Sequence, residues 1–174
     1  MTPLPHPENL HLQAAEGWLL LGDPASAEQE LARLSATART RPEVLDREWT
    51  IHAQRERWAE AHAVAQRLVA AAPADPNGWL RRAYAARRMP GGGLQSAWDA
   101  LRPAVGRFAQ EPLIAYNLAC YAAQMTRLAE AWGWLQRALA MAPRRAKLQD
   151  LALADADLQP LWPILTAQRA PGRR

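Results

Sequence analysis

The sequence predicts an all-α fold built from stacked helix hairpins, and two observations support this. Hydrophobic residues make up 49% of the 174 residues. Alanine and leucine are prominent among them, whereas isoleucine, valine, threonine, tyrosine and phenylalanine are scarce, a balance that favours helices over strands. The second observation is an apolar pattern with helical spacing that recurs about every 34 residues, as expected of a repeat array.

The clearest repeat unit runs from Pro112 to Pro143. Its first half carries one apolar helix face, formed by Ala115, Leu118, Ala119 and Ala122. After a polar break at residues 125–127, its second half carries another face, formed by Leu128, Ala131, Leu135 and Ala138. Two amphipathic helices joined by a short turn predict an antiparallel hairpin.

The same layout occurs elsewhere in the chain. Seventy residues earlier, the four apolar positions of the second helix are occupied by Trp58, Ala61, Ala65 and Leu68. Four units can be aligned in this way, beginning near Glu8, Pro42, Pro76 and Pro112. We therefore predict an array over residues 8–143, with repeats at about 8–41, 42–75, 76–111 and 112–145.

These units resemble the tetratricopeptide repeat (TPR) family, in particular small bacterial TPR proteins. The family's unit carries an early aromatic residue or leucine, small residues where its helices cross, and a closing proline. The last unit matches best, through Leu118, Ala119, Ala131, Leu135, Ala138 and Pro143, and the third supplies Trp79, Ala83 and Ala97. The resemblance implies a right-handed α-α superhelix, or solenoid, of about four hairpins with a C-terminal capping helix.

Two units depart from the pattern. In the second unit, Glu48 stands where the family has leucine and Trp49 where it has a small residue, so we expect its first helix to be rotated or packed unusually. The first unit lacks a closing proline, which predicts a longer second helix or a looser turn.

A cap is predicted at residues 146–166, because a repeat array must cover its last apolar face. The segment with Asp155, Asp157, Leu158, Pro160 and Leu161 is similar to a tail that follows the last repeat in many bacterial TPR proteins. We expect the two aspartates to bond backbone amides there. Residues 1–7 and 167–174 are expected to be flexible tails.

Charge and cysteine usage limit the classes of partner and compartment. The net charge is +4 and the pI about 10.0, but the arginines are scattered along the chain, so nucleic acid is not expected as a partner. The single cysteine, Cys120, excludes an intrachain disulfide and favours a reducing compartment. With no leader-like start and no long apolar run, we expect a cytoplasmic protein without a membrane segment.

The run "RRMPGGGLQS" raises the alternative of a nucleotide-binding enzyme. Its Gly91–Gly93 triplet lacks the following lysine and the preceding strand of a phosphate-binding loop, so a structural turn is the favoured interpretation. The four histidines have no spacing typical of a metal site. We therefore predict no catalytic residue, no metal and no cofactor, and we expect Cys120 to be packed.

Eight tryptophans could form a platform for a sugar or a nucleobase. The repeat pattern assigns most of them to packing instead, namely Trp18, Trp58, Trp79, Trp98 and Trp132.

The resemblance places function in a concave groove lined by the first helix of each unit. The residues that match groove positions and that we select as candidate binding residues are Arg47, Asn77, Arg81, Tyr84, Arg88, Tyr116, Asn117 and Gln124. Arginine, tyrosine and asparagine together suit an acidic or carboxylate-bearing peptide. The hypothesis is a non-catalytic scaffold or adaptor that binds a peptide or a partner helix; the alternative is a small secretion-type TPR chaperone for a client protein. The oligomeric state is left open.

Overall fold

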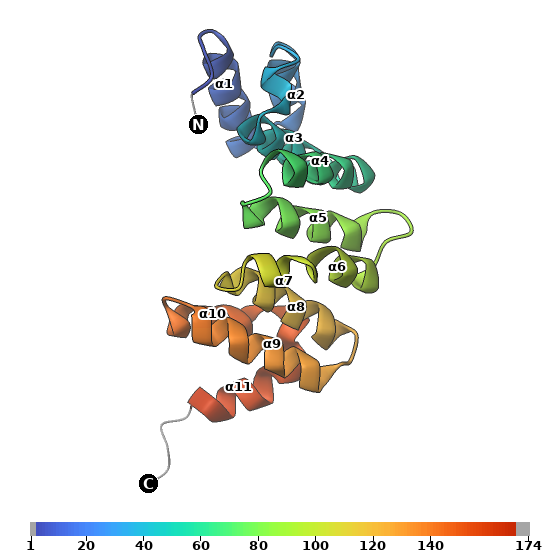
Figure 1. Cartoon of the computed structure of the whole chain (residues 1–174), viewed down its shortest axis with the longest axis vertical. Helices are drawn as coiled ribbons and strands as arrows, with labels where there is room; N and C mark the ends of the chain where they lie inside the picture. The colour runs from blue at the N-terminus through green and yellow to red at the C-terminus, as the bar shows by residue number, and fades with distance from the viewer. Residues whose placement is uncertain (1–2, 170–174) are drawn as a thin grey trace. The chain divides into compact units, whose positions relative to one another are not determined.

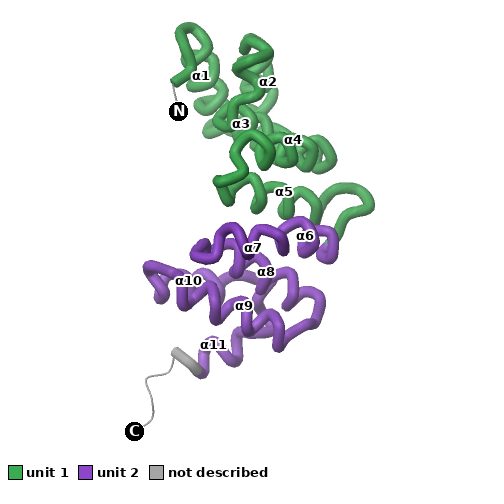
Figure 2. Tube along the Cα trace, viewed as in Figure 1, with its two compact units in different colours: residues 1–93 green, residues 94–174 purple. Residues whose placement is uncertain are grey.

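The computed structural model describes residues 3–169, and this part of the chain is helical and contains no strand (Figure 1). The chain divides into two compact units, Met1–Gly93 and Leu94–Arg174 (Figure 2). No helix within the described residues is long and apolar enough to cross a membrane.

Unit 1 holds two helix hairpins and one further helix. Its elements are α1 (Glu8–Leu20), α2 (Pro24–Ala32), the short 3-10 helix η1 (Ala38–Thr40), α3 (Pro42–Gln54), α4 (Trp58–Ala71) and α5 (Pro76–Arg88). Helix α1 packs on α2, α3 packs on α4, and α4 packs in turn on α5.

Unit 2 holds one hairpin with short helices on either side of it in the sequence. Its elements are α6 (Leu94–Leu101), α7 (Ala104–Arg107), α8 (Pro112–Gln124), α9 (Leu128–Met141), α10 (Arg145–Ala154), the 3-10 helix η2 (Ala156–Leu161) and α11 (Trp162–Arg169). Helices α8 and α9 form the hairpin, and η2 packs against α8. The predicted cap therefore corresponds to α10, η2 and most of α11.

The first helices begin at the residues where the repeats were expected to start. These are Glu8 in α1, Pro42 in α3, Pro76 in α5 and Pro112 in α8. Proline is favoured at the first helical position because its missing N–H would have no partner there. The repeat grouping itself stays an interpretation, since α5 and α6, which would form the third hairpin, lie in different units.

The turns repeat as the helices do. Gly22, Glu56 and Thr126 adopt positive φ angles of 77°, 53° and 60° in the turns that follow α1, α3 and α8. Left-handed backbone is uncommon for Glu and Thr, so its recurrence at intervals of 34 and 70 residues indicates that one hairpin geometry is reused.

Alanines at the start of the second helices let the helices approach closely. The equivalent residues Ala27, Ala61, Ala97 and Ala131 are all fully buried. A small side chain at a helix crossing shortens the distance between the helix axes. Close packing of the helices at this position therefore explains why alanine recurs there.

Some expectations about packing were wrong. Trp18 was assigned to the core, but it is 39% exposed. Leu4 lies in the expected N-terminal tail, yet it is buried in the core of the first hairpin. Helix α11 continues to Arg169, beyond the expected end of the cap at residue 166, while residues 170–174 lie outside the described part. Helix α2 ends at Ala32 and is short, so the looser turn is the alternative that holds.

Candidate peptide-binding groove

A groove runs along the first helices of unit 1. One hollow of about 370 Å³ is lined by Pro42, Glu43, Asp46, Arg47, Leu68, Asp75, Asn77 and Arg81. A second, of about 210 Å³, is lined by Glu16, Leu19, Leu20, Asp46, Arg47, Thr50, Gln54 and Arg81. Three residues, Asp46, Arg47 and Arg81, line both, so the two hollows adjoin.

Helical spacing places the candidate residues of each helix on one face. On α5, Asn77, Arg81, Tyr84 and Arg88 follow one another at steps of three or four residues and so share one face. On α3, Arg47, Thr50 and Gln54 do the same. Five of the eight candidate residues lie in unit 1, namely Arg47, Asn77, Arg81, Tyr84 and Arg88.

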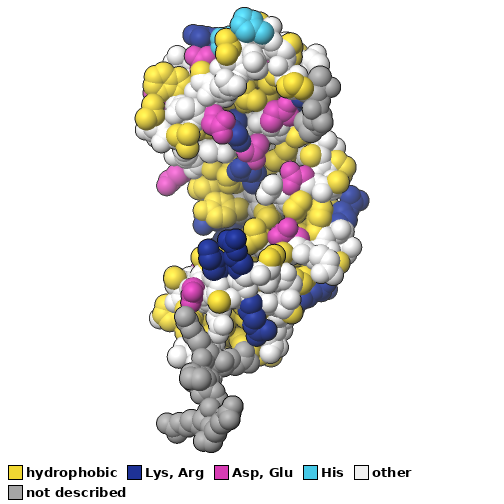
Figure 3. Space-filling view, turned by 90° about the vertical axis from the view of Figure 1, so that its left-hand side faces the viewer, with side chains coloured by type: hydrophobic (Ala, Val, Ile, Leu, Met, Phe, Trp, Pro, Cys, Tyr) yellow, Lys and Arg dark blue, Asp and Glu magenta, His cyan; other side chains and the backbone are white. Residues whose placement is uncertain are grey.

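Carboxylates of the same unit already neutralise two of these arginines. Asp46 accepts from Arg47 Nη1 and from Arg81 Nη2, both at 2.6 Å. Arg47 also donates from Nη2 to Glu16 at 2.9 Å. Figure 3 shows acidic side chains beside basic ones on the face that it draws. This part of the groove is thus charge-balanced, and a ligand would have to compete with Asp46 for the guanidinium groups.

Burial perturbs Arg81. It lowers the pKa of the guanidinium from its usual value, and the nearby Asp46 opposes that shift. An arginine stays protonated at neutral pH even so. Arg81 therefore acts as a fixed, paired cation inside the wall of the groove.

Aromatic rings continue the wall from Arg81 towards the end of α5. The Arg81 guanidinium lies 4.3 Å from the ring centre of Trp49, and Tyr84 lies edge-on to Trp49 with 6.0 Å between ring centres. Trp58 follows, 5.8 Å from Tyr84. These contacts hold Tyr84 in place while leaving it 40% exposed.

Arg88 differs from the other two arginines of the groove. Its guanidinium lies 3.5 Å from the ring centre of Tyr84 and 5.5 Å from that of Trp58. Its one hydrogen bond among the described residues goes to the Tyr84 carbonyl, and no carboxylate of that part of the chain pairs with it. A stacked, exposed guanidinium with free donors is suited to bind a carboxylate.

The three candidates in unit 2 lie on α8, and two of them contact the cap. Tyr116 was expected to face a partner, but it is only 5% exposed and donates to Asp155 at 2.9 Å. Gln124 donates to the Asp157 carbonyl. Asn117 donates to the Leu113 carbonyl of its own helix. Tyr116 is thus buried rather than facing a partner, because its hydroxyl is bonded to Asp155 of the predicted cap.

The start of η2 brings a thiol and two carboxylates together. Ligand atoms of Cys120, Asp155 and Asp157 lie within 4.8 Å of one another. Asp155 accepts from the Asp157 backbone N–H at 3.0 Å, as expected for a capping aspartate, and Cys120 is buried as predicted. Burial and the bond to Asp155 raise the pKa of the Tyr116 hydroxyl. These contacts hold the segment that is predicted to be the cap against α8.

The glycine run closes α5. Gly91 and Gly93 have φ angles of 74° and 136°, and the N–H groups of Gly92 and Gly93 donate to the carbonyls of Met89 and Ala86. Two amides that a phosphate-binding loop would direct at its ligand are thus used to cap the helix. This geometry supports the structural-turn interpretation.

Sequence reasoning missed the partners of the arginines. Glu16 lies 31 residues from Arg47, and Asp46 lies 35 residues from Arg81, so no spacing rule within one helix would pair them. Trp49 was noted as a departure from the repeat, but its stacking with Arg81 was not foreseen. The tryptophan at position 49, where the family has a small residue, was the one feature of the sequence that could have indicated this contact.

Comparison with known proteins supports the fold. No protein-family model matches the chain, and no curated protein sequence matches it. Among solved structures, the crystal structure of MamA, a TPR-containing protein, superposes with a TM-score of 0.69 over 82% of each chain. The two sequences are 15% identical, so the likeness shows the fold alone. The fold is thus a TPR-like helical repeat.

Proposed function

We propose that this protein is a non-catalytic interaction scaffold that binds a segment of another protein in the groove along α1, α3 and α5. The observation that carries the proposal is the exposed Arg88, stacked on Tyr84 and left without a carboxylate partner in the described residues. The two hollows, lined on α5 by Arg81 about two turns before Arg88, offer room for an extended peptide.

The partner segment is proposed to be acidic or to carry a terminal carboxylate. Its carboxylate would bind at Arg88, because Arg47 and Arg81 are already paired with Asp46. The rest of the segment would lie over Tyr84 and over Leu20, which is 84% exposed. Since the single cysteine leaves no intrachain disulfide to maintain, we propose the cytoplasm as its location.

The test measures binding of a peptide library in which acidic residues are replaced one by one by their amides. We expect acidic peptides to bind, and Arg88→Glu to weaken the best of them by about tenfold or more. Arg33→Glu is the control, since Arg33 follows the last residue of α2, is exposed and lies outside the groove. Equal binding of acidic and amide peptides, or no effect of Arg88→Glu in a folded protein, would contradict the proposal.

A further inference from the structure

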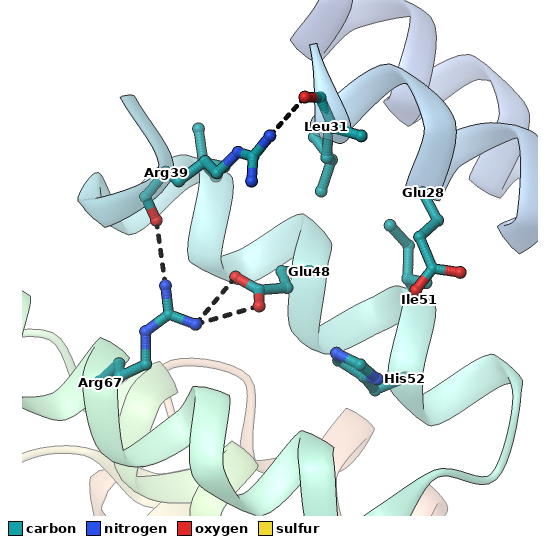
Figure 4. Close-up of a pocket in the computed structure, with 9 residues that line it drawn as sticks. Glu28, Leu31, Arg39, Glu48, Ile51, His52 and Arg67 are labelled. Atoms are coloured by element: carbon teal, nitrogen blue, oxygen red, sulfur yellow. Dashed lines mark hydrogen bonds and ion pairs between the residues drawn. The ribbon is translucent and has the colours of Figure 1, made fainter. Parts of the chain in front are cut away.

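A third hollow lies on the opposite face of α3. Its volume is about 320 Å³, and it is lined by Glu28, Leu31, Ala32, Arg39, Val44, Glu48, Ile51, His52 and Arg67 (Figure 4). These residues come from α2, η1, α3 and α4 and include none of the groove residues. An inference drawn from this hollow is therefore independent of the proposed function.

The floor of the hollow is apolar. Leu31, Val44 and Ile51 form it and are 7%, 1% and 2% exposed. Helix α2 has 9 residues where α4 and α9 have 14, so the second helix of the first hairpin ends early. The polar Glu48, at the position of the repeat's leucine, does not fill the space.

Most charges around the rim are compensated. Glu48 accepts from Arg67 at 3.0 Å, and Glu28 pairs with Arg55 and Arg57. Arg39 is the exception. It donates to the carbonyls of Ala32 and Leu34 and meets no carboxylate of the described chain.

Polar groups lie at two sides of the hollow. Figure 4 shows Arg39 and Arg67 on one side and Glu28 and His52 on the other. The Nδ1 atom of His52 is buried and has no hydrogen-bond partner among the described residues. Burying such an atom without a partner is costly, so a ligand that bonds to it would recover that cost.

We infer that this hollow binds an aliphatic carboxylate, with the carboxylate at Arg39 and the apolar chain on Leu31, Val44 and Ile51. A volume near the lower limit of known ligand sites admits a short chain or one large side chain. Two sources share this chemistry: a free short-chain fatty acid, and a peptide that ends in a residue such as leucine. Only the peptide brings an amide N–H, which His52 Nδ1 can accept.

The experiment titrates the full chain with hexanoate, N-acetyl-leucine and N-acetyl-leucinamide, and follows binding by NMR. We expect dissociation constants on the order of 1 mM for the two carboxylates, as for ligands of this size. Binding of N-acetyl-leucine about tenfold tighter than that of hexanoate assigns the site to a peptide terminus. Equal or tighter binding of hexanoate assigns it to a fatty acid. N-acetyl-leucinamide binding as tightly as the carboxylates would overturn the inference, as would the absence of saturation by either carboxylate.

Variants test the location. Ala32 is exposed at the rim, so Ala32→Trp can fill the hollow without disturbing the core, and it should abolish binding. Arg39→Gln should weaken binding about tenfold. Arg33→Gln removes an equal charge from a residue that does not line the hollow and should have no effect. Retained binding in Ala32→Trp would also overturn the inference.

Discussion

The ion pair between Asp46 and Arg81 is the contact in the groove whose energy can be derived most directly. Their atoms lie 2.6 Å apart, and each side chain is 24% exposed. The perturbation is a double-mutant cycle with Asp46→Asn and Arg81→Gln, alone and together. Its coupling free energy isolates this pair from the other partners of the two residues.

The burial of the pair sets the expected magnitude. Two unit charges about 4 Å apart attract by about 1 kcal/mol in water and by about 4 kcal/mol at an effective dielectric constant of about 20. Fully exposed pairs contribute only about 0.2–1 kcal/mol. Because a quarter of each side chain remains exposed, and burial also costs solvation, we expect a coupling of about 1.5 kcal/mol.

Urea unfolding of the wild type, the two single variants and the double variant gives the coupling. Asp46→Asn should cost more than Arg81→Gln, because it leaves Arg81 without a carboxylate and also removes a partner of Arg47. The Glu30–Arg33 pair, in which Arg33 is 58% exposed, is the control, with an expected coupling of about 0.3 kcal/mol. A coupling below about 0.5 kcal/mol for Asp46 and Arg81 would refute the reasoning.

Three other substitutions test packing and burial. Tyr116→Phe should cost about 1 kcal/mol. The raised pKa of the buried phenol favours its neutral form in the folded state. The wild type should therefore lose stability as the pH rises above about 10, and Tyr116→Phe should not show this loss. Burial lowers the pKa of His52, so stability should fall as the pH drops below about 6.5, and His52→Gln should reduce that loss. Gly92→Ala should cost about 2 kcal/mol or more, since its Cβ would lie 2.0 Å from the Ala86 carbonyl oxygen.

These three outcomes are measured by urea unfolding across pH, and comparison variants accompany the His52 and Gly92 substitutions. Burial also lowers the pKa of His62, so only the double variant with His62→Gln should remove both histidine contributions. Gly133→Ala places a methyl group in open space on α9 and should stabilise by about 0.5–1 kcal/mol. A His52→Gln variant with an unchanged pH profile would contradict the burial argument, and a Gly92→Ala variant as stable as the wild type would contradict the steric argument.

The sequence predicted the helix starts because local chemistry determines them. Pro42, Pro76 and Pro112 each mark a first helical turn, and the alanines 34 to 36 residues apart mark the crossings. Trp18 was misplaced, since it lies on the apolar face predicted for α1 and is still 39% exposed. An apolar stripe shows that a helix has a face to bury, but it does not show that a neighbour is present.

The repeat pattern could not predict which of the candidate residues are free to bind a ligand. Tyr116 and Arg88 both occupy groove positions, yet the hydroxyl of Tyr116 is bonded to Asp155, 39 residues further along the chain. Arg47 and Arg81 are paired with carboxylates, whereas Arg88 is not. Such contacts between elements depend on the fold rather than on spacing, so the repeat pattern could not distinguish these residues.

The departures from the repeat mark the two candidate sites. Glu48 and Trp49 occupy the positions of Leu118 and Ala119, two buried core residues of α8. Being adjacent on α3, they point in different directions: Glu48 lines the hollow beside α2, and Trp49 supports Arg81 in the groove. A leucine would have helped to fill the hollow, and an alanine would have offered no ring for stacking. Residues at the regular positions of a repeat are used for packing, so binding surfaces can arise where that packing is interrupted. In unit 1 both interruptions, Glu48 and Trp49, fall on the same turn of α3.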